Sequence, residues 1–179
     1  MFFVLSDGEQ MKFADAEFSY LEELLSSIDV SLARTNARIK QSDVWDIDCL
    51  CDKGEYLIGV GFCAMQRYLF DILRDVKIDP GLARELGPKS TNGVPVAKLV
   101  HSAANYWKHE PEWHSWLLEL QEKSQKTVDT ILHRRDSADY PLSELLADFC
   151  GENDLLLVNC LPYLSEWRSA VWEHVSKNV

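Results

Sequence analysis

Two long segments of this chain repeat apolar residues at alternating spacings of three and four, the period of an amphipathic α-helix. The first begins at Asp15 and carries its stripe on Phe18, Leu21, Leu25, Ile28, Leu32, Thr35 and Ile39. The second runs from about Glu55 to Val76 and carries its stripe on Ile58, Phe62, Met65, Leu69, Ile72 and Val76. Helices of this length must bury such stripes against other elements, so the pattern predicts an all-α fold.

Shorter helical patterns occupy much of the remaining chain. We expect further helices over Val94–His109, Trp113–His133, Pro141–Phe149 and from Pro162 onward. Proline at 111 ends the first of these because it cannot donate the next backbone bond. A small hairpin with an Asp7-Gly8 turn is expected over Met1–Phe13. We predict breaks between helices at Ser42–Lys53, Lys77–Gly93 and His133–Tyr140, the second with a short helical turn near Leu82–Leu86. The apolar run Asp154–Leu161 is of ambiguous secondary-structure type.

These patterns lack the alternation of strand and helix that marks an α/β sheet, and they contain no internal repeat. We therefore predict one helical domain over residues 1–179. Its core is an antiparallel four-helix bundle over about residues 15–135, and the helices of residues 141–179 pack on that core. Gly59 and Gly61 weaken helix propensity, so we expect them to permit close helix contact.

Composition favours a protein of the cytoplasm. The chain has no run of about 18 apolar residues, so no membrane span is expected. Its first residues, MFFVLSDGEQ, lack the basic start of a secretion signal. The cysteines are odd in number, which favours free thiols in a reducing compartment: Cys49, Cys51, Cys63, Cys150 and Cys160.

Charge is unevenly distributed along the chain, whose net charge is −11. Residues 61–110 hold seven Lys and Arg against five Asp and Glu, and both flanking segments are acidic. This segment contains the Val94–His109 helix, whose polar side has no acid and carries Lys98, His101, Ser102, Asn105, Lys108 and His109. An acidic protein repels nucleic acid overall, whereas a local basic cleft can bind an anion.

His101, Asn105 and His109 are spaced four residues apart, so they share one face of the helix. Histidine exchanges a proton near neutral pH and can act as a general acid or base. Lys98 and Lys108 flank this row and are expected to hold an anionic group by charge. The alternative interpretation is the solvated face of a surface helix.

The run from Ala104 to His109, ANYWKH, resembles a degenerate form of the signature of the HEPN superfamily. In that signature an arginine and a following polar residue precede a histidine, four to six residues after the arginine. Asn105 matches the polar position and His109 the histidine, whereas Ala104 stands at the arginine position. The resemblance implies an all-helical bundle with metal-independent endoribonuclease activity of toxin or defence type, with RNA as partner and a homodimer as the working form.

The resemblance also implies roles for individual residues. His109 would handle a proton as a ribose 2′-hydroxyl attacks the adjacent phosphate, and Asn105 would orient His109 or the phosphate. Arg67 on the second long helix, or Lys108, would supply the cation that Ala104 cannot. Losing such a cation costs about two to three orders of magnitude in rate. An inactive HEPN-like protein, or a non-catalytic helical module that binds another protein, is therefore the alternative.

The end of this helix offers residues for two other kinds of site. Four possible metal ligands surround Pro111, but they lack a helical ligand spacing such as HExxH: His109, Glu110, Glu112 and His114. We expect no metal ion and no other cofactor. Trp107, Trp113 and Trp116 could stack on nucleic-acid bases, although helical spacing of aromatic residues favours a place in the core.

Overall fold

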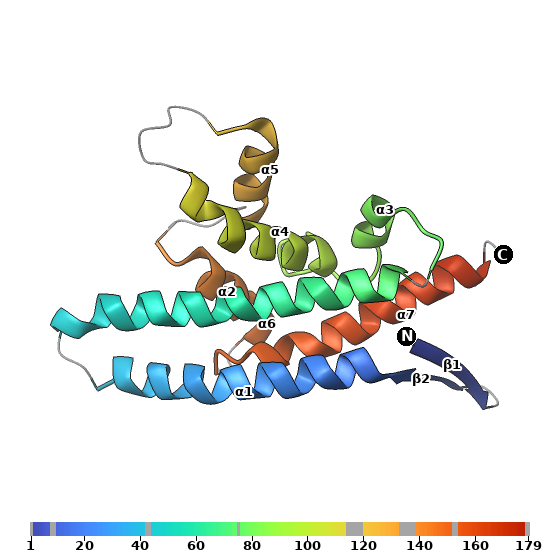
Figure 1. The fold of residues 1–179 in the computed structure, drawn as a ribbon, viewed down its shortest axis with the longest axis horizontal. Helices are drawn as coiled ribbons and strands as arrows, with labels where there is room; N and C mark the ends of the chain where they lie inside the picture. The colour runs from blue at the N-terminus through green and yellow to red at the C-terminus, as the bar shows by residue number, and fades with distance from the viewer. Residues whose placement is uncertain are drawn as a thin grey trace.

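Two long antiparallel helices, α1 and α2, lie side by side along the long axis of the structure (Figure 1). They span Ala16–Ile39 and Val44–Arg74. This computed structural model describes residues 2–7, 10–41, 44–74, 76–113, 120–132, 139–151 and 154–177, with side chains from residue 14 onward except at 44 and 45. The first predicted helix is confirmed, and Asp15 caps it by accepting a hydrogen bond from the backbone N–H of Phe18.

The start of α2 differs from the prediction. The helix begins at Val44 instead of about Glu55, so the break expected over Ser42–Lys53 is wrong from Val44 onward. Acidic residues do not end a helix near its N-terminus, because the helix dipole favours a carboxylate there, as at Asp46 in the first turn. Leu50 is 5% exposed and extends the buried stripe towards the N-terminus.

Shorter elements complete the fold. They are β1 (Phe2–Asp7), β2 (Gln10–Asp15), α3 (Pro80–Glu85), α4 (Val96–His109), η1 (Glu110–Glu112), α5 (Glu122–Ile131), α6 (Pro141–Cys150), η2 (Leu157–Cys160) and α7 (Leu161–Lys177). The all-α prediction is confirmed, and within the described residues the one sheet is the antiparallel pair β1–β2. The expected hairpin is present, but Gly8 of its predicted turn lies outside the described residues.

The predicted helix over Trp113–His133 is shorter in the structure. Helix α5 begins only at Glu122, and Trp113 follows the 3₁₀ turn η1. Of the residues in α5, only Ile131 is buried, so little apolar burial stabilises a longer helix here. Residues 114–119 and most of the expected break at His133–Tyr140 lie outside the described residues.

One cluster of buried side chains draws on all seven α-helices. Helix α1 packs on α2, α2 on α4 and α4 on α5, as expected for helices that follow one another in an antiparallel bundle. Helix α6 packs on α2, and α7 on α4. Helix α7 contributes more to the core than α5 does, because Leu164, Trp167 and Val171 are fully buried.

Gly59 and Gly61 of α2 have the role that the sequence predicted. A Cβ atom at Gly59 would overlap the indole ring of Trp107 on α4. At Gly61 it would come within 2.5 Å of Leu157. Both positions therefore require the absence of a side chain, which confirms that they permit close contact.

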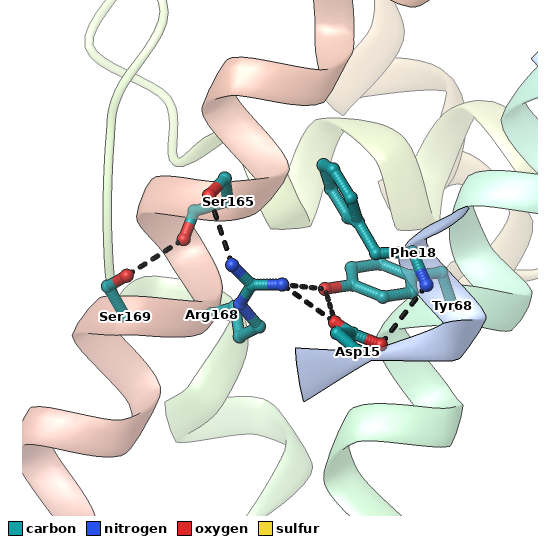
Figure 2. Close-up of polar contacts among 6 residues, drawn as sticks. All are labelled: Asp15, Phe18, Tyr68, Ser165, Arg168 and Ser169. Carbon is teal, nitrogen blue, oxygen red and sulfur yellow. Dashed lines mark hydrogen bonds and ion pairs between the residues drawn. The ribbon is translucent and has the colours of Figure 1, made fainter. Parts of the chain in front are cut away.

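A buried ion pair joins the start of α1 to α2 and α7 (Figure 2). The Oδ2 atom of Asp15 accepts hydrogen bonds from Tyr68 at 2.7 Å and from Nη1 of Arg168 at 2.8 Å. The side chains of Asp15 and Arg168 are 3% and 9% exposed. The guanidinium also lies 5.2 Å from the centre of the Phe18 ring, in cation–π contact.

Two further carboxylates of the long helices cap elements near the C-terminus. Asp29 of α1 accepts from the backbone N–H groups of Leu157 and Val158, at 2.7 and 3.0 Å. Glu55 of α2 accepts from those of Leu142 and Ser143 in the first turn of α6, at 2.7 and 2.9 Å. Burial raises the pKa of both carboxyl groups, and these hydrogen bonds oppose that rise.

The five cysteines are free thiols, as predicted, and Cys150 and Cys160 are buried. Among the described residues, no helix is both long and apolar enough to cross a membrane.

Replacing Gly59 with alanine is expected to lower the free energy of unfolding by about 1–3 kcal/mol, because the added methyl group overlaps Trp107. Gly54→Ala is the matched control in the same helix. Its Cβ would meet only Leu32, at 4.0 Å, so the better helix former is expected to stabilise by up to about 1 kcal/mol. Urea denaturation measures both, and an unchanged Gly59→Ala protein would contradict the close contact.

Replacing Arg168 with methionine is expected to lower the free energy of unfolding by about 3–5 kcal/mol, because Asp15 then stays buried without its charged partner. Lys177→Met is the control on the same helix, since it removes only an exposed pair with Glu173. Equal stability of the two variants in urea would show that the buried pair does not hold α7 in place.

Candidate functional site

Helix α4 lies between α2 and α5 (Figure 1). Asn105 and His109 line a groove of about 230 Å³ between α4 and α5, which we call the α4–α5 groove. Its other lining residues are Glu112, Trp113, Gln121, Lys123, Ser124 and Thr127. The structure therefore brings the two residues that match the HEPN signature to one concave surface.

His109 is at the solvent-accessible end of α4, with a side chain that is 51% exposed. Its Nδ1 atom lies 3.1 Å from Oε1 of Glu112. Because this contact occupies Nδ1, a proton exchanged with a bound molecule would pass through Nε2. The geometry suits a histidine that is oriented by a carboxylate and is accessible from the groove.

Lys123 of α5 lines this groove and places a positive charge there. The sequence pattern does not indicate this role for Lys123. Helix α5 also carries Lys126, which pairs with Glu122 at 2.6 Å and does not line the groove. The sequence contains no signal that separates the two lysines, since only the packing of α5 on α4 decides which one lies beside His109.

Gln66 of α2 was also missed, although it is 5% exposed and organises the polar side of α4. Its Nε2 atom donates to the backbone oxygen of His101 at 3.1 Å and to Oδ1 of Asn105 at 3.0 Å. Its Oε1 atom accepts from Nζ of Lys108 at 2.7 Å. We call Gln66, His101, Asn105 and Lys108 the Gln66 cluster. A single glutamine within an apolar helix pattern belongs to no motif, so the sequence gives no signal for it.

His101 belongs to the Gln66 cluster but does not line the α4–α5 groove. Its ring nitrogens lie 3.0 Å from Nε2 of Gln66 and 3.1 Å from Nδ2 of Asn105, and in the neutral ring one of the two nitrogens accepts while the other carries the proton. Burial, and then the charges of Arg84, Lys108 and Lys123, lower the pKa of His101 from 6.5 to about 4. His101 is therefore neutral at neutral pH and is a hydrogen-bonding residue of the cluster.

Arg67 does not lie at the groove, contrary to the expectation from the sequence. Successive residues of a helix are rotated by about 100°, so Gln66 faces α4 while Arg67 faces elsewhere. The Arg67 side chain is 73% exposed, pairs with Asp71 at 2.9 Å and lines a groove beside Tyr20 of α1. It cannot replace the arginine of the signature within one copy of the chain.

Lys98 and Ala104 also lie apart from the groove. Lys98 pairs with Glu85 at 2.9 Å, and its position is roughly 16 Å along the helix from that of His109. Ala104 is fully buried, and its carbonyl oxygen accepts from the Cys63 thiol at 3.8 Å. An arginine at this position would enter the core rather than the groove.

Among the described residues, no group of three or more His, Cys, Asp and Glu side chains is arranged to hold a metal ion. His114, one of the four ligands considered from the sequence, lies outside the described residues. Trp116 does too, whereas Trp107 and Trp113 pack edge-on against Tyr56 and Tyr106.

The free energy of unfolding is expected to depend on the protonation of His101. The pKa of His101 is about 4 in the folded protein, whereas its ordinary value is 6.5. Between these two pH values the unfolded chain therefore binds more protons than the folded protein does. Stability should therefore fall by on the order of 1–2 kcal/mol as the pH is lowered through this window, with allowance for partial exposure.

The measurement is urea denaturation of the wild type and a His101→Gln variant across this pH window. The carboxyl groups of Asp29 and Glu55, whose pKa is raised, change stability in the opposite direction, but they are common to both proteins and cancel in the difference. If the difference in free energy of unfolding between the two proteins does not change with pH, the proposal that His101 is a buried neutral histidine is wrong.

No family model, curated protein or solved structure matches this chain. Its functional interpretation therefore depends on the geometry of the α4–α5 groove and the residues around it.

Proposed function

We propose that the α4–α5 groove binds the phosphodiester backbone of RNA and that His109 transfers a proton in metal-independent cleavage of that backbone. The observation that carries this proposal is the presence of Asn105, His109 and Lys123 along one groove. The resemblance of residues 104–109 to the HEPN superfamily supports the choice of RNA as the ligand.

In the proposed reaction, the ribose 2′-hydroxyl attacks the adjacent phosphorus and the bond to the 5′ oxygen breaks. His109 accepts the hydroxyl proton at Nε2, while Glu112 beside Nδ1 holds the ring in place. The leaving 5′ oxygen takes up a proton from water, and His109 then returns its own proton to the solvent. The products carry a 2′,3′-cyclic phosphate and a 5′-hydroxyl. This chemistry needs no metal ion.

Lys123 supplies the positive charge that the buried Ala104 cannot. It balances the charge that develops on the phosphate, and a group of this kind contributes about two to three orders of magnitude in rate. Asn105 hydrogen-bonds the phosphate. Gln66 holds Asn105 in place by donating a hydrogen bond from Nε2 to Oδ1 of Asn105 at 3.0 Å. The net charge of −11 repels RNA elsewhere on the surface, so binding is confined to a short single-stranded segment.

A second candidate is a non-catalytic module that binds another protein. Helix α1 exposes Tyr20 and Leu24, at 68% and 47%, beside a groove of about 180 Å³ between α1 and α2. Exposed apolar side chains at a concave surface are typical of protein interaction sites. The acidic balance of the chain also fits a protein partner better than RNA.

Replacing His109 with alanine is expected to reduce cleavage of single-stranded RNA by about two to four orders of magnitude, with binding retained, because only proton transfer is lost. The assay contains a chelator and follows cyclic-phosphate ends, while fluorescence anisotropy measures binding. Lys123→Ala should weaken binding, and Lys126→Ala is its control on the same helix because Lys126 does not line the groove.

Equal cleavage rates for the wild type and His109→Ala would end the catalytic proposal. Binding that is the same in Lys123→Ala and Lys126→Ala would show that RNA does not use this groove. If the wild type neither binds nor cleaves RNA, the protein-binding candidate replaces the first.

A further inference from the structure

A larger cavity lies on another side of the α4 C-terminus, where it meets α2 and the start of α6. Its volume is about 570 Å³, within the usual range for small-molecule sites. Helix α2 contributes Tyr56, α4 contributes Tyr106 and Trp107, and Tyr140 precedes α6. We call this cavity the aromatic pocket. Asn105 and His109 do not line it, so its ligand does not depend on the proposed nuclease activity.

Aromatic rings form much of the wall of this pocket. The rings of Tyr56 and Trp107 lie 5.3 Å apart between centroids and at 73° to each other, so they present two nearly perpendicular surfaces. The position of Trp107 is set from behind by Gly59, where any side chain would overlap the indole. Tyr56 is 60% exposed, although burial in the core would be the ordinary place for a large aromatic ring.

The pocket is also negatively charged. Among the described residues, four carboxylates and one ammonium group line it: Asp52, Glu55, Glu110, Asp139 and Lys108. Lys108 donates to Gln66 at 2.7 Å, and Glu55 uses both oxygens to cap α6, so neither is the main contact for a ligand. Asp52 and Glu110 are exposed carboxylates at the pocket. Burial, followed by the charges of Glu110 and Glu55, raises the pKa of the Tyr106 phenol, as expected in a negative field.

We propose that the aromatic pocket binds an organic cation, an ammonium or guanidinium group carried on an apolar body, with the charge over Tyr56 and Trp107 and near Asp52 and Glu110. Aromatic faces attract such cations through the negative face of the ring, and the attraction grows as water is removed. A phosphate or another anion is excluded because carboxylates outnumber the single ammonium group. An uncharged apolar ligand would fit the rings but would not interact favourably with the exposed carboxylates of Asp52 and Glu110.

Binding to the full chain is tested with choline and with dimethylbutanol, its uncharged analogue in which carbon replaces the ammonium nitrogen. Calorimetry and tryptophan fluorescence measure affinity. Choline is expected to bind at least about tenfold more tightly than the alcohol, because the two probes differ in charge and hardly in shape. A second arm uses acetyl-lysine-methylamide, in which the ε-amino group is unmodified. Tighter binding of this probe assigns the site to a side chain of a basic peptide, and tighter binding of choline assigns it to a free quaternary ammonium compound.

Tyr56→Ala is expected to weaken binding of the preferred cation about tenfold, and Asp52→Asn severalfold with a smaller salt dependence. Both side chains are exposed, so neither change should unfold the protein. Tyr20→Ala is the matched control, because Tyr20 is also largely exposed, at 68%, but lies on α1 outside this pocket. Equal affinity for choline and the alcohol, equal affinity of Tyr56→Ala and Tyr20→Ala, or no binding of any cation at millimolar concentration would overturn the proposal.

Discussion

The arrangement of the last third of this chain depends on three buried or half-buried carboxylates: Asp15 at the start of α1, Asp29 within α1 and Glu55 in α2. A buried carboxylate is tolerated only when donors surround it, and each of the three has found donors in a different C-terminal element. Asp15 is paired with Arg168 of α7, Asp29 caps η2, and Glu55 caps α6. Because each carboxylate accepts at least two hydrogen bonds, these contacts specify where η2, α6 and α7 lie on the pair α1–α2.

The packing of α4 on α2 determines which part of α4 is accessible. Trp107 fits against α2 at Gly59, and Gln66 binds Asn105 and Lys108 across the helix interface. These contacts fix the rotation of α4 about its own axis. One side of its C-terminal half then faces α5 with Asn105 and His109, while Trp107 and Tyr106 line the aromatic pocket.

The C-terminal end of α4 thus separates two sites of opposite chemistry. The α4–α5 groove combines a histidine, an amide and a lysine, which suits an anionic ligand. The aromatic pocket combines rings and carboxylates, which suits a cation. Lys108 lines the aromatic pocket and donates a hydrogen bond to Gln66, and its charge contributes to lowering the pKa of His101 in the same cluster. Under the two proposals, this separation would allow an acidic chain to bind an anion at the α4–α5 groove while the rest of its surface repels anions.

The sequence by itself determined the elements, because helix periodicity and capping are local properties. It predicted α1 from Asp15 onward, the short helix α6 from Pro141, and the close contact at Gly59. It was wrong where local signals were weak, at the acidic start of α2 and over the length of α5. It also placed His109 and Asn105 on one helix face, since residues four apart share that face. Only the tertiary structure decided that Gln66 and not Arg67 faces α4, and that Lys123 lies across the groove. Those choices depend on how one helix is rotated against another, and packing of distant side chains sets that rotation.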